Sequence, residues 1–306
     1  MTAPAEEAVR DAATDSVTLA FGDASAKLYG LARLGLSRSA EGARQGSALA
    51  LLFAGRKPVA ALARGALPVA DDAGWEALEV AGLRATVQAP LDRWSVSFHA
   101  RDGHGFALEL AALGEAAELG ADDPAGRLGG MAGYDQPCRV RGTVRAGGRE
   151  QRFDGLGQRG HAWGDADWER IELARTVTAW TDERCAALTA IRPAGARDHA
   201  AEATWAALWE PEAKPSVETG SRRARRHVVE IADGRLSTTY DADGHTRRAG
   251  LELWAVGAEW PRRAAGEVLC GSSLDLGALR LDCSFFRWQL EGHAGVGRYD
   301  IVRRAA

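Results

Sequence analysis

Short runs of alternating apolar and polar residues, separated by turn-forming residues, recur along most of the 306-residue chain. Trp94, Val96 and Phe98, for example, alternate with serine and histidine positions. Successive side chains of a strand point to opposite faces, so this alternation predicts strands with one buried face. Turn signals at regular spacing between such runs are typical of a sandwich or a barrel. The pattern therefore predicts an all-β protein.

Glycine, proline and aspartate locate individual turns. Four segments separate apolar runs and are predicted hairpin turns: 55–58, 101–103, 181–183 and 232–234. Residues 27–36 carry some helical periodicity, but Gly30 and Gly35 weaken a helix there, so we interpret the stretch as a strand. Residues 122–133 have the loosest sequence and are predicted to form a long loop.

The central stretch, residues 155–168, concentrates chemically distinctive side chains. It holds four glycines, one histidine, two tryptophans and two aspartates. Glycine permits close backbone approach, tryptophan offers a large apolar face, and histidine titrates near neutral pH. Gly155, Gly157 and Gly160 also spell G-x-G-x-x-G, but the flanking sequence predicts neither a strand before them nor a helix after them. A dinucleotide site is therefore not predicted.

The same stretch resembles a known signature. His-x-Trp-Gly followed by Asp-Trp, after Gly-x-Gly-x-Arg, is similar to the motif of the hydroxyneurosporene synthase (carotenoid hydratase) superfamily. Weaker similarities lie at residues 21–36 and at 286–299. The resemblance implies two lipocalin-like β-barrels in tandem and an apolar ligand. Two positions depart from it: Gly160 stands where the family usually has Asp, and Ala166 where Arg is common.

The resemblance and the pattern together suggest a division of the chain. We expect a tail at residues 1–15, an N-terminal lipocalin-like barrel at 16–145, and a C-terminal one at 146–306 with the central motif at the junction. The composition, with 46% hydrophobic and 26% charged residues, is that of a soluble globular protein.

The net charge and the cysteine content limit which binding partners and which cellular compartment we expect for the protein. A formal net charge of -4 favours neither nucleic acid nor an anionic membrane surface as a partner. The longest apolar run, residues 48–54, is too short to span a bilayer, so no transmembrane segment is expected. The four cysteines are scattered without a C-x-x-C pair, which favours a reduced, cytoplasmic protein.

Candidate catalytic groups lie within the central stretch. His161 and Trp163 share one face if the segment is extended, as do Asp165 and Asp167. A carboxyl with a raised pKa can protonate a carbon–carbon double bond, so we expect His161 and one of the two aspartates to handle protons. Other interpretations stay open: His161 as a structural histidine beside a core tryptophan, and the aspartates as turn residues or partners of arginine.

Other side chains could shape a binding pocket. The residues expected to contact ligand are Trp163, Trp168, Trp180, Trp288 and Arg159. No metal is expected, because His99 and His104 bracket a turn without a visible third ligand. Residues 241–244 are similar to the start of a calcium loop but are interpreted as a turn, since the later ligands are missing.

These observations lead to a functional hypothesis. We expect an enzyme that needs no organic cofactor and acts on a hydrophobic, isoprenoid- or polyketide-like substrate. The reaction would be acid-initiated hydration, isomerisation or cyclisation of a double bond. The alternative is a non-catalytic carrier of lipid or terpenoid, which needs the pocket and the aromatics but no desolvated acid. A structural module that binds a partner would instead have its cavity filled by side chains.

Overall fold

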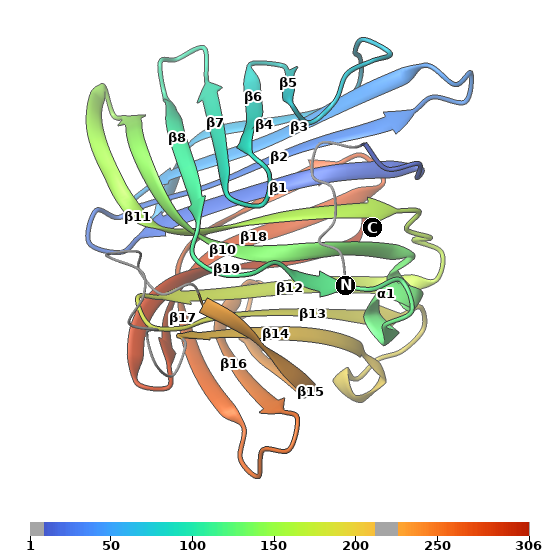
Figure 1. Cartoon of the computed structure of the whole chain (residues 1–306), viewed down its shortest axis with the longest axis vertical. Helices are drawn as coiled ribbons and strands as arrows, with labels where there is room; N and C mark the ends of the chain where they lie inside the picture. Colours follow the sequence, from blue (N-terminus) through green and yellow to red (C-terminus); the bar gives the residue numbers. More distant parts are fainter. Residues whose placement is uncertain (1–8, 212–225, 306) are drawn as a thin grey trace, which may run out of the picture.

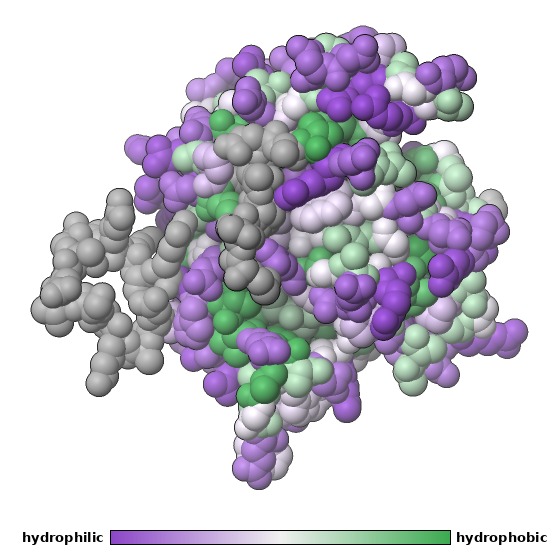
Figure 2. Space-filling model, turned by 45° about the vertical axis from the view of Figure 1, so that its right-hand side comes forward, coloured by the Kyte–Doolittle hydropathy of each residue, from purple (hydrophilic) through white to green (hydrophobic). Residues whose placement is uncertain are grey.

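The computed structural model describes residues 9–211 and 226–305, which fold almost entirely into antiparallel strands (Figure 1). The strands form two sheets, one in the upper half of Figure 1 and one in the lower half. No helix within the described residues is long and apolar enough to cross a membrane. The face seen in Figure 2 is mainly hydrophilic, with apolar side chains in separate patches.

The first sheet has eleven strands in the order β4-β3-β2-β1-β11-β10-β8-β7-β6-β5, with β9 paired to β10. Its two ends approach each other, since β3 contacts both β5 and β6, and the sheet forms a nearly closed barrel. Its strands are β1 (Thr14–Asp23), β2 (Leu28–Arg38), β3 (Arg44–Ala54), β4 (Lys57–Pro68), β5 (Ala77–Val80), β6 (Leu83–Ala89), β7 (Arg93–His99), β8 (Gly105–Ala112), β9 (Ala117–Leu119), β10 (Met131–Ala146) and β11 (Arg149–Gly164).

The second sheet is a closed barrel of eight strands in sequence order. They are β12 (Ile171–Thr181), β13 (Cys185–Pro193), β14 (Ala203–Pro211), β15 (Arg226–Tyr240), β16 (Thr246–Ala255), β17 (Arg262–Leu276), β18 (Leu279–Leu290) and β19 (His293–Arg304). A short helix, α1 (Pro124–Gly129), precedes β10, and a 3₁₀ turn, η1 (His199–Ala201), precedes β14.

Each barrel has an apolar interior made by the inward half of its alternating strands. In the first, Phe21 packs edge-on against Phe106 and Phe153, with ring centroids 5.2 and 5.1 Å apart. In the second, Phe286 stacks on Trp288 at 5.6 Å. Both interiors are thus filled in part by large aromatic side chains.

A third apolar cluster joins the two barrels. Tyr29 of the first barrel stacks on Phe285 of the second, with centroids 5.5 Å apart and an interplanar angle of 28°. Phe53 approaches the same Phe285 ring edge-on at 5.9 Å. Strands β1 and β19 also face each other closely, because a Cβ on Gly22 would lie only 2.7 Å from Cγ1 of Val296. The outward faces of β1, β2 and β3 are therefore buried against the second barrel.

The predicted fold class is confirmed: the protein is all-β and consists of two tandem lipocalin-like barrels. The turns at 55–58, 101–103 and 181–183 each join two consecutive strands, and residues 28–36 of the stretch predicted to be a strand lie in β2. The interpretation of 122–133 as a loop is wrong in part, because α1 begins there at Pro124.

Two further expectations are corrected by the sheet pairing. Residues 232–234 do not form a hairpin turn; β15 runs straight through them, and a register shift between Ile231 and Asp233 absorbs the turn-like sequence as a bulge.

The first sheet extends beyond the expected limit of 145, because β11 pairs with β1 as far as Gly164. The second barrel begins at Ile171, and Asp15 belongs to β1 rather than to a tail.

Candidate functional site

His161 lies on the inward face of β11, where it pairs with a carboxylate of β1. Its ring is buried, with 1% of its surface exposed, and its Nε2 lies 2.5 Å from Oδ1 of Asp15. The other carboxylate oxygen of Asp15 accepts the backbone N–H of Arg10 at 2.7 Å and the indole N–H of Trp75 at 3.1 Å. One carboxylate therefore connects β11 to the N-terminal segment and to the loop between β4 and β5.

Aromatic rings enclose this His–Asp pair. Trp75, Tyr134 and Trp163 meet the imidazole edge-on, with centroids 5.5, 5.7 and 5.3 Å away. The guanidinium carbon of Arg10 lies 4.5 Å from the ring centre of Trp163 and covers it. Such an arrangement holds His161 in one orientation and surrounds it with protein.

The two aspartates expected to handle protons together with His161 do not lie beside it. Asp165 and Asp167 follow the end of β11 and are exposed, and Asp167 accepts the backbone N–H two residues further on at 3.0 Å. Asp154 pairs with two arginines of β10. The carboxylate that reaches the His161 ring is instead Asp15, which the sequence pattern places in a tail.

The residues expected to contact ligand are spread over several environments. Trp163 lies beside His161; Trp180 is buried between the barrels and donates to a glutamine of β11 at 3.2 Å. Trp288 is buried in the interior of the second barrel, and Trp168 packs near α1. Arg159 is buried in the first barrel, where its Nε donates to a glutamine of β10 at 2.7 Å. The structure does not bring these five side chains to one surface.

A second group of candidate functional side chains lies on the opposite face of β11. Four residues form a row of direct register partners across four neighbouring strands. They are Arg33 of β2, Thr18 of β1, Gly160 of β11 and Asp135 of β10. Directly opposed residues point to the same side, and neighbouring residues along a strand to opposite sides. This row therefore faces the second barrel, whereas His161 faces inward.

Gly160 makes room for the acid of this row. A methyl group at Gly160 would collide with a carboxylate oxygen of Asp135. The carboxylate thus lies over the bare backbone of β11.

The second barrel adds two charged residues to the same space. Arg298 and Asp300 of β19 pair with Phe285 and Cys283 of β18, both of which belong to the cluster between the barrels. The Nε of Arg298 lies 3.2 Å from Oδ2 of Asp300, and its backbone N–H donates to Oγ1 of Thr178 at 3.2 Å. We call Arg33, Asp135, Arg298 and Asp300 the inter-barrel charge cluster.

Burial shifts the pKa values of three members of this cluster, namely Asp135, Asp300 and Arg33. It raises the pKa of Asp135, against the opposing effects of Arg298 and the Gln158 amide. It likewise raises the pKa of Asp300, against Arg298 and other partners. Burial and the charge of Arg298 lower the pKa of Arg33. Arg298 thus lies within electrostatic reach of both carboxyls.

These side chains also keep solvent-accessible surface. Asp135 and Asp300 are half-buried and Arg33 is exposed, although protein from both barrels surrounds them. Apolar residues of the joining cluster continue beside them, since Leu31 lies two positions along β2 and Leu49 is the β3 partner of Arg33. Charged and apolar side chains thus lie side by side between the barrels.

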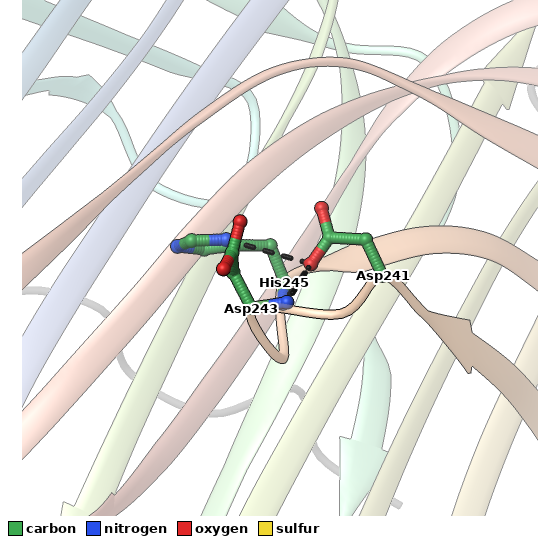
Figure 3. Close-up of side chains that lie close together, drawn as sticks. All are labelled: Asp241, Asp243 and His245. Carbon is green, nitrogen blue, oxygen red and sulfur yellow. Dashed lines mark hydrogen bonds and ion pairs between the residues drawn. The ribbon is translucent and has the colours of Figure 1, made fainter.

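One further group has potential metal ligands. Ligand atoms of Asp241, Asp243 and His245 lie within 4.8 Å of one another at the turn after β15 (Figure 3). The Asp241 carboxylate already accepts the backbone N–H groups of Asp243 and His245, at 3.1 and 2.9 Å. Formation of the turn accounts for its placement. His104 lies 3.0 Å from Asp102, and His99 is exposed at the end of β7.

Solved structures similar to this chain share its architecture. The crystal structure of an AttH-like protein from Nitrosomonas europaea superimposes with a TM-score of 0.67 at 13% identity, covering 96% of this chain and 93% of that one. CghA with Sch210972 gives a TM-score of 0.57 at 14% identity, covering 95% and 88%. A second crystal structure of CghA gives 0.57 at 13%, covering 98% and 94%. At these identities the likeness shows the fold alone.

Sequence comparison gives the family. Among curated proteins, none matches the sequence. A family model described as a domain of unknown function, DUF7064, matches residues 4–303 and so spans both barrels and both clusters described above. The chain belongs to the DUF7064 family.

Proposed function

We propose that the protein is an enzyme that acts on a hydrophobic, isoprenoid- or polyketide-like substrate in the space between its two barrels. The reaction is acid-initiated hydration, isomerisation or cyclisation of a carbon–carbon double bond. The observation that carries the proposal is the position of Asp135, which lies over Gly160 between the barrels, where burial raises its pKa. A carboxyl with a raised pKa keeps its proton to higher pH and can deliver it to an alkene.

The proposed roles follow from the surroundings of each acid. Asp135 lies over Gly160 and has no direct ion pair in the described part of the chain, so it is the better proton donor. Asp300 is ion-paired with Arg298, which favours its carboxylate form and suits it to accept a proton from the cation or from the attacking water. One proton enters and one leaves, so an isomerisation or hydration is balanced.

His161 has a supporting role in this proposal. Its pair with Asp15 fixes β1 against β11, the two strands that present Thr18 and Gly160 to the other barrel. His161 is thus a positioning residue, and the aspartates after β11 are not part of the proposed acid machinery.

A non-catalytic carrier is the second candidate function. The ion pair between Arg298 and Asp300 favours the carrier function. Nε of Arg298 lies 3.2 Å from Oδ2 of Asp300, and this pairing alone accounts for the position of the carboxylate without a role in proton donation. One of the structural neighbours is CghA with Sch210972, which agrees with binding as well as with turnover. A carrier would bind apolar ligands saturably and return them unchanged.

Asp135→Asn distinguishes the two functions. Asn keeps the shape of the side chain but cannot donate the proton, so turnover should fall about a hundred- to ten-thousand-fold while ligand affinity stays within about threefold. The assay follows consumption of a panel of isoprenoid and polyketide-derived alkenes by mass spectrometry, with affinity from tryptophan quenching. Asp233→Asn, an exposed acid of β15, is the matched control.

Three outcomes decide the proposal. Full activity in Asp135→Asn would overturn the assignment of the acid. A large loss in Asp165→Asn with none in Asp135→Asn would move the chemistry to the end of β11. Saturable binding without conversion of any alkene would establish the carrier.

A further inference from the structure

The inter-barrel charge cluster has more cationic donor groups than its own acids use. We infer that Arg33 and Arg298 bind the carboxylate of the substrate, so that the substrate is an amphipathic carboxylic acid with an unsaturated apolar chain. This inference rests on the proposed function of the same site and names the class of molecule that the site takes.

Arg33 is the first reason. Its Nη2 donates to Oγ of Ser16 at 3.0 Å, and no ion pair of Arg33 within 4.0 Å occurs among residues 9–211 and 226–305. A guanidinium carries five donors, so most of its capacity is unused by these residues. Arg33 keeps accessible surface between the barrels, where an anion can reach it.

Arg298 is the second reason. The residue is 6% exposed, its Nε faces Asp300, and its Nη1 has no hydrogen-bond partner within the described chain. The bond from its backbone to Thr178 fixes the strand that carries it. A buried guanidinium with an unused N–H on a rigid strand is a preorganised donor.

The charge of the cluster selects a monoanion. The cluster contains two guanidiniums and two carboxyls, and burial favours the neutral form of both acids. When one acid is protonated, the cluster carries one excess positive charge. A singly charged carboxylate neutralises that charge, whereas a phosphate would bring a second negative charge toward Asp135 and Asp300. The planar guanidinium also matches a carboxylate in shape.

The apolar neighbours suit the remainder of such a molecule. Leu31 and Leu49 lie next to Arg33 on the same face of β2 and β3, and the cluster between the barrels continues from them to Tyr29 and Phe53. A carboxylate held at Arg33 would place its chain against Leu49, the least buried of these apolar side chains. The proton donor Asp135 lies at the other end of the same row of register partners.

Binding of a polyene acid and its methyl ester tests the inference. Quenching of tryptophan fluorescence by cis-parinaric acid and by methyl cis-parinarate is titrated at about pH 7.5, where a carboxylic acid is ionised. The native protein should bind the acid about ten- to a hundred-fold more tightly than the ester, the range expected for charge-assisted hydrogen bonds. Arg33→Gln should reduce this preference to within about threefold and leave ester affinity unchanged.

Two further variants test whether a lost preference for the acid reflects the Arg33 side chain rather than loss of the fold. Arg33→Lys keeps the charge but loses the planar fork, so it should retain an intermediate preference. Arg64→Gln, an exposed arginine of β4, should behave as the native protein. Thermal unfolding of each variant shows whether it is folded under the titration conditions.

The outcomes separate this inference from the proposed function. Equal binding of acid and ester by the native protein overturns the inference, as does no saturable binding of either probe. A preference that survives in both Arg33→Gln and Arg298→Gln also overturns it. A preference that depends on Arg33, together with full activity in Asp135→Asn, would support the carboxylate site and reject the proposed acid.

Discussion

Two adjacent residues of β11 serve different parts of the molecule. His161 faces the interior of the first barrel and pairs with Asp15, whereas Gly160 faces the second barrel and accommodates the carboxylate of Asp135. Asp135 belongs to the neighbouring strand β10 and is the direct register partner of Gly160.

The raised pKa of Asp135 predicts a pH-dependent gain in stability from Asp135→Asn. The unfolded carboxyl ionises near pH 3.9, but folded Asp135 retains its proton to higher pH. Its contribution to stability is therefore fully present below about pH 3.9 and is lost as the pH rises through the folded pKa. Asn avoids that loss, so the variant should match the native protein at low pH and exceed it at neutral pH.

Urea unfolding at a series of pH values measures this effect, with Asp233→Asn as the exposed control. A variant that is less stable than the native protein at neutral pH would contradict the prediction. It would show that the negative charge of Asp135 is needed to balance Arg298.

His161→Gln should weaken the fold rather than the chemistry. Gln cannot reproduce the imidazole contact to Asp15, whose carboxylate would be left partly unsatisfied in a buried place. We expect a loss of about 1–3 kcal/mol in the free energy of unfolding. Denaturant unfolding measures it, and His99→Gln at the exposed end of β7 is the control. Unchanged stability combined with a large loss of turnover would instead identify a catalytic histidine.

The alternation of apolar and polar residues explains which strands and turns the sequence could predict and which pairings it could not. Alternation identified the strands, and short turn motifs identified most hairpins. The glycine and aspartate at 232–234 led to a wrong prediction of a hairpin turn, because a bulge within a strand uses the same residue types as a turn. The limit of the first sheet was missed because the partner of β11 is β1, which no local pattern reveals.

The inter-barrel charge cluster escaped prediction for a related reason. Arg33, Asp135, Arg298 and Asp300 occupy outward positions of alternating strands, which the sequence alone presents as an ordinary solvent-facing side. Only the packing of one barrel on the other turns that side into an interior. The central motif was found because its glycines, histidine and tryptophans are unusual in composition, and it contributes Gly160 to the row of residues that faces the second barrel.

The two barrels share an apolar interface, so the whole molecule should unfold as one unit. Phe285 is fully buried and contacts Tyr29 and Phe53 of the other barrel. Phe285→Ala should cost about 3–5 kcal/mol in the free energy of unfolding, through lost contacts and the cavity left behind. Circular dichroism and tryptophan fluorescence should report a single coincident transition before and after the change.

Leu276→Ala, a more exposed apolar residue of β17, is the control and should change stability little. Two separate transitions in the native protein would show that the barrels are energetically independent.

The pairing of β1 with β11 also sets the order in which the chain can be assembled during synthesis. Asp15 and His161 are separated by 146 positions, so β1 emerges from the ribosome long before its second partner exists. Until then β1 presents an unpaired edge, which is open to association with other chains. Contacts between such distant positions also slow folding, because a long loop must close before they form. The inter-barrel charge cluster draws its residues from β2, β10 and β19, so it can form only after all three strands have been made.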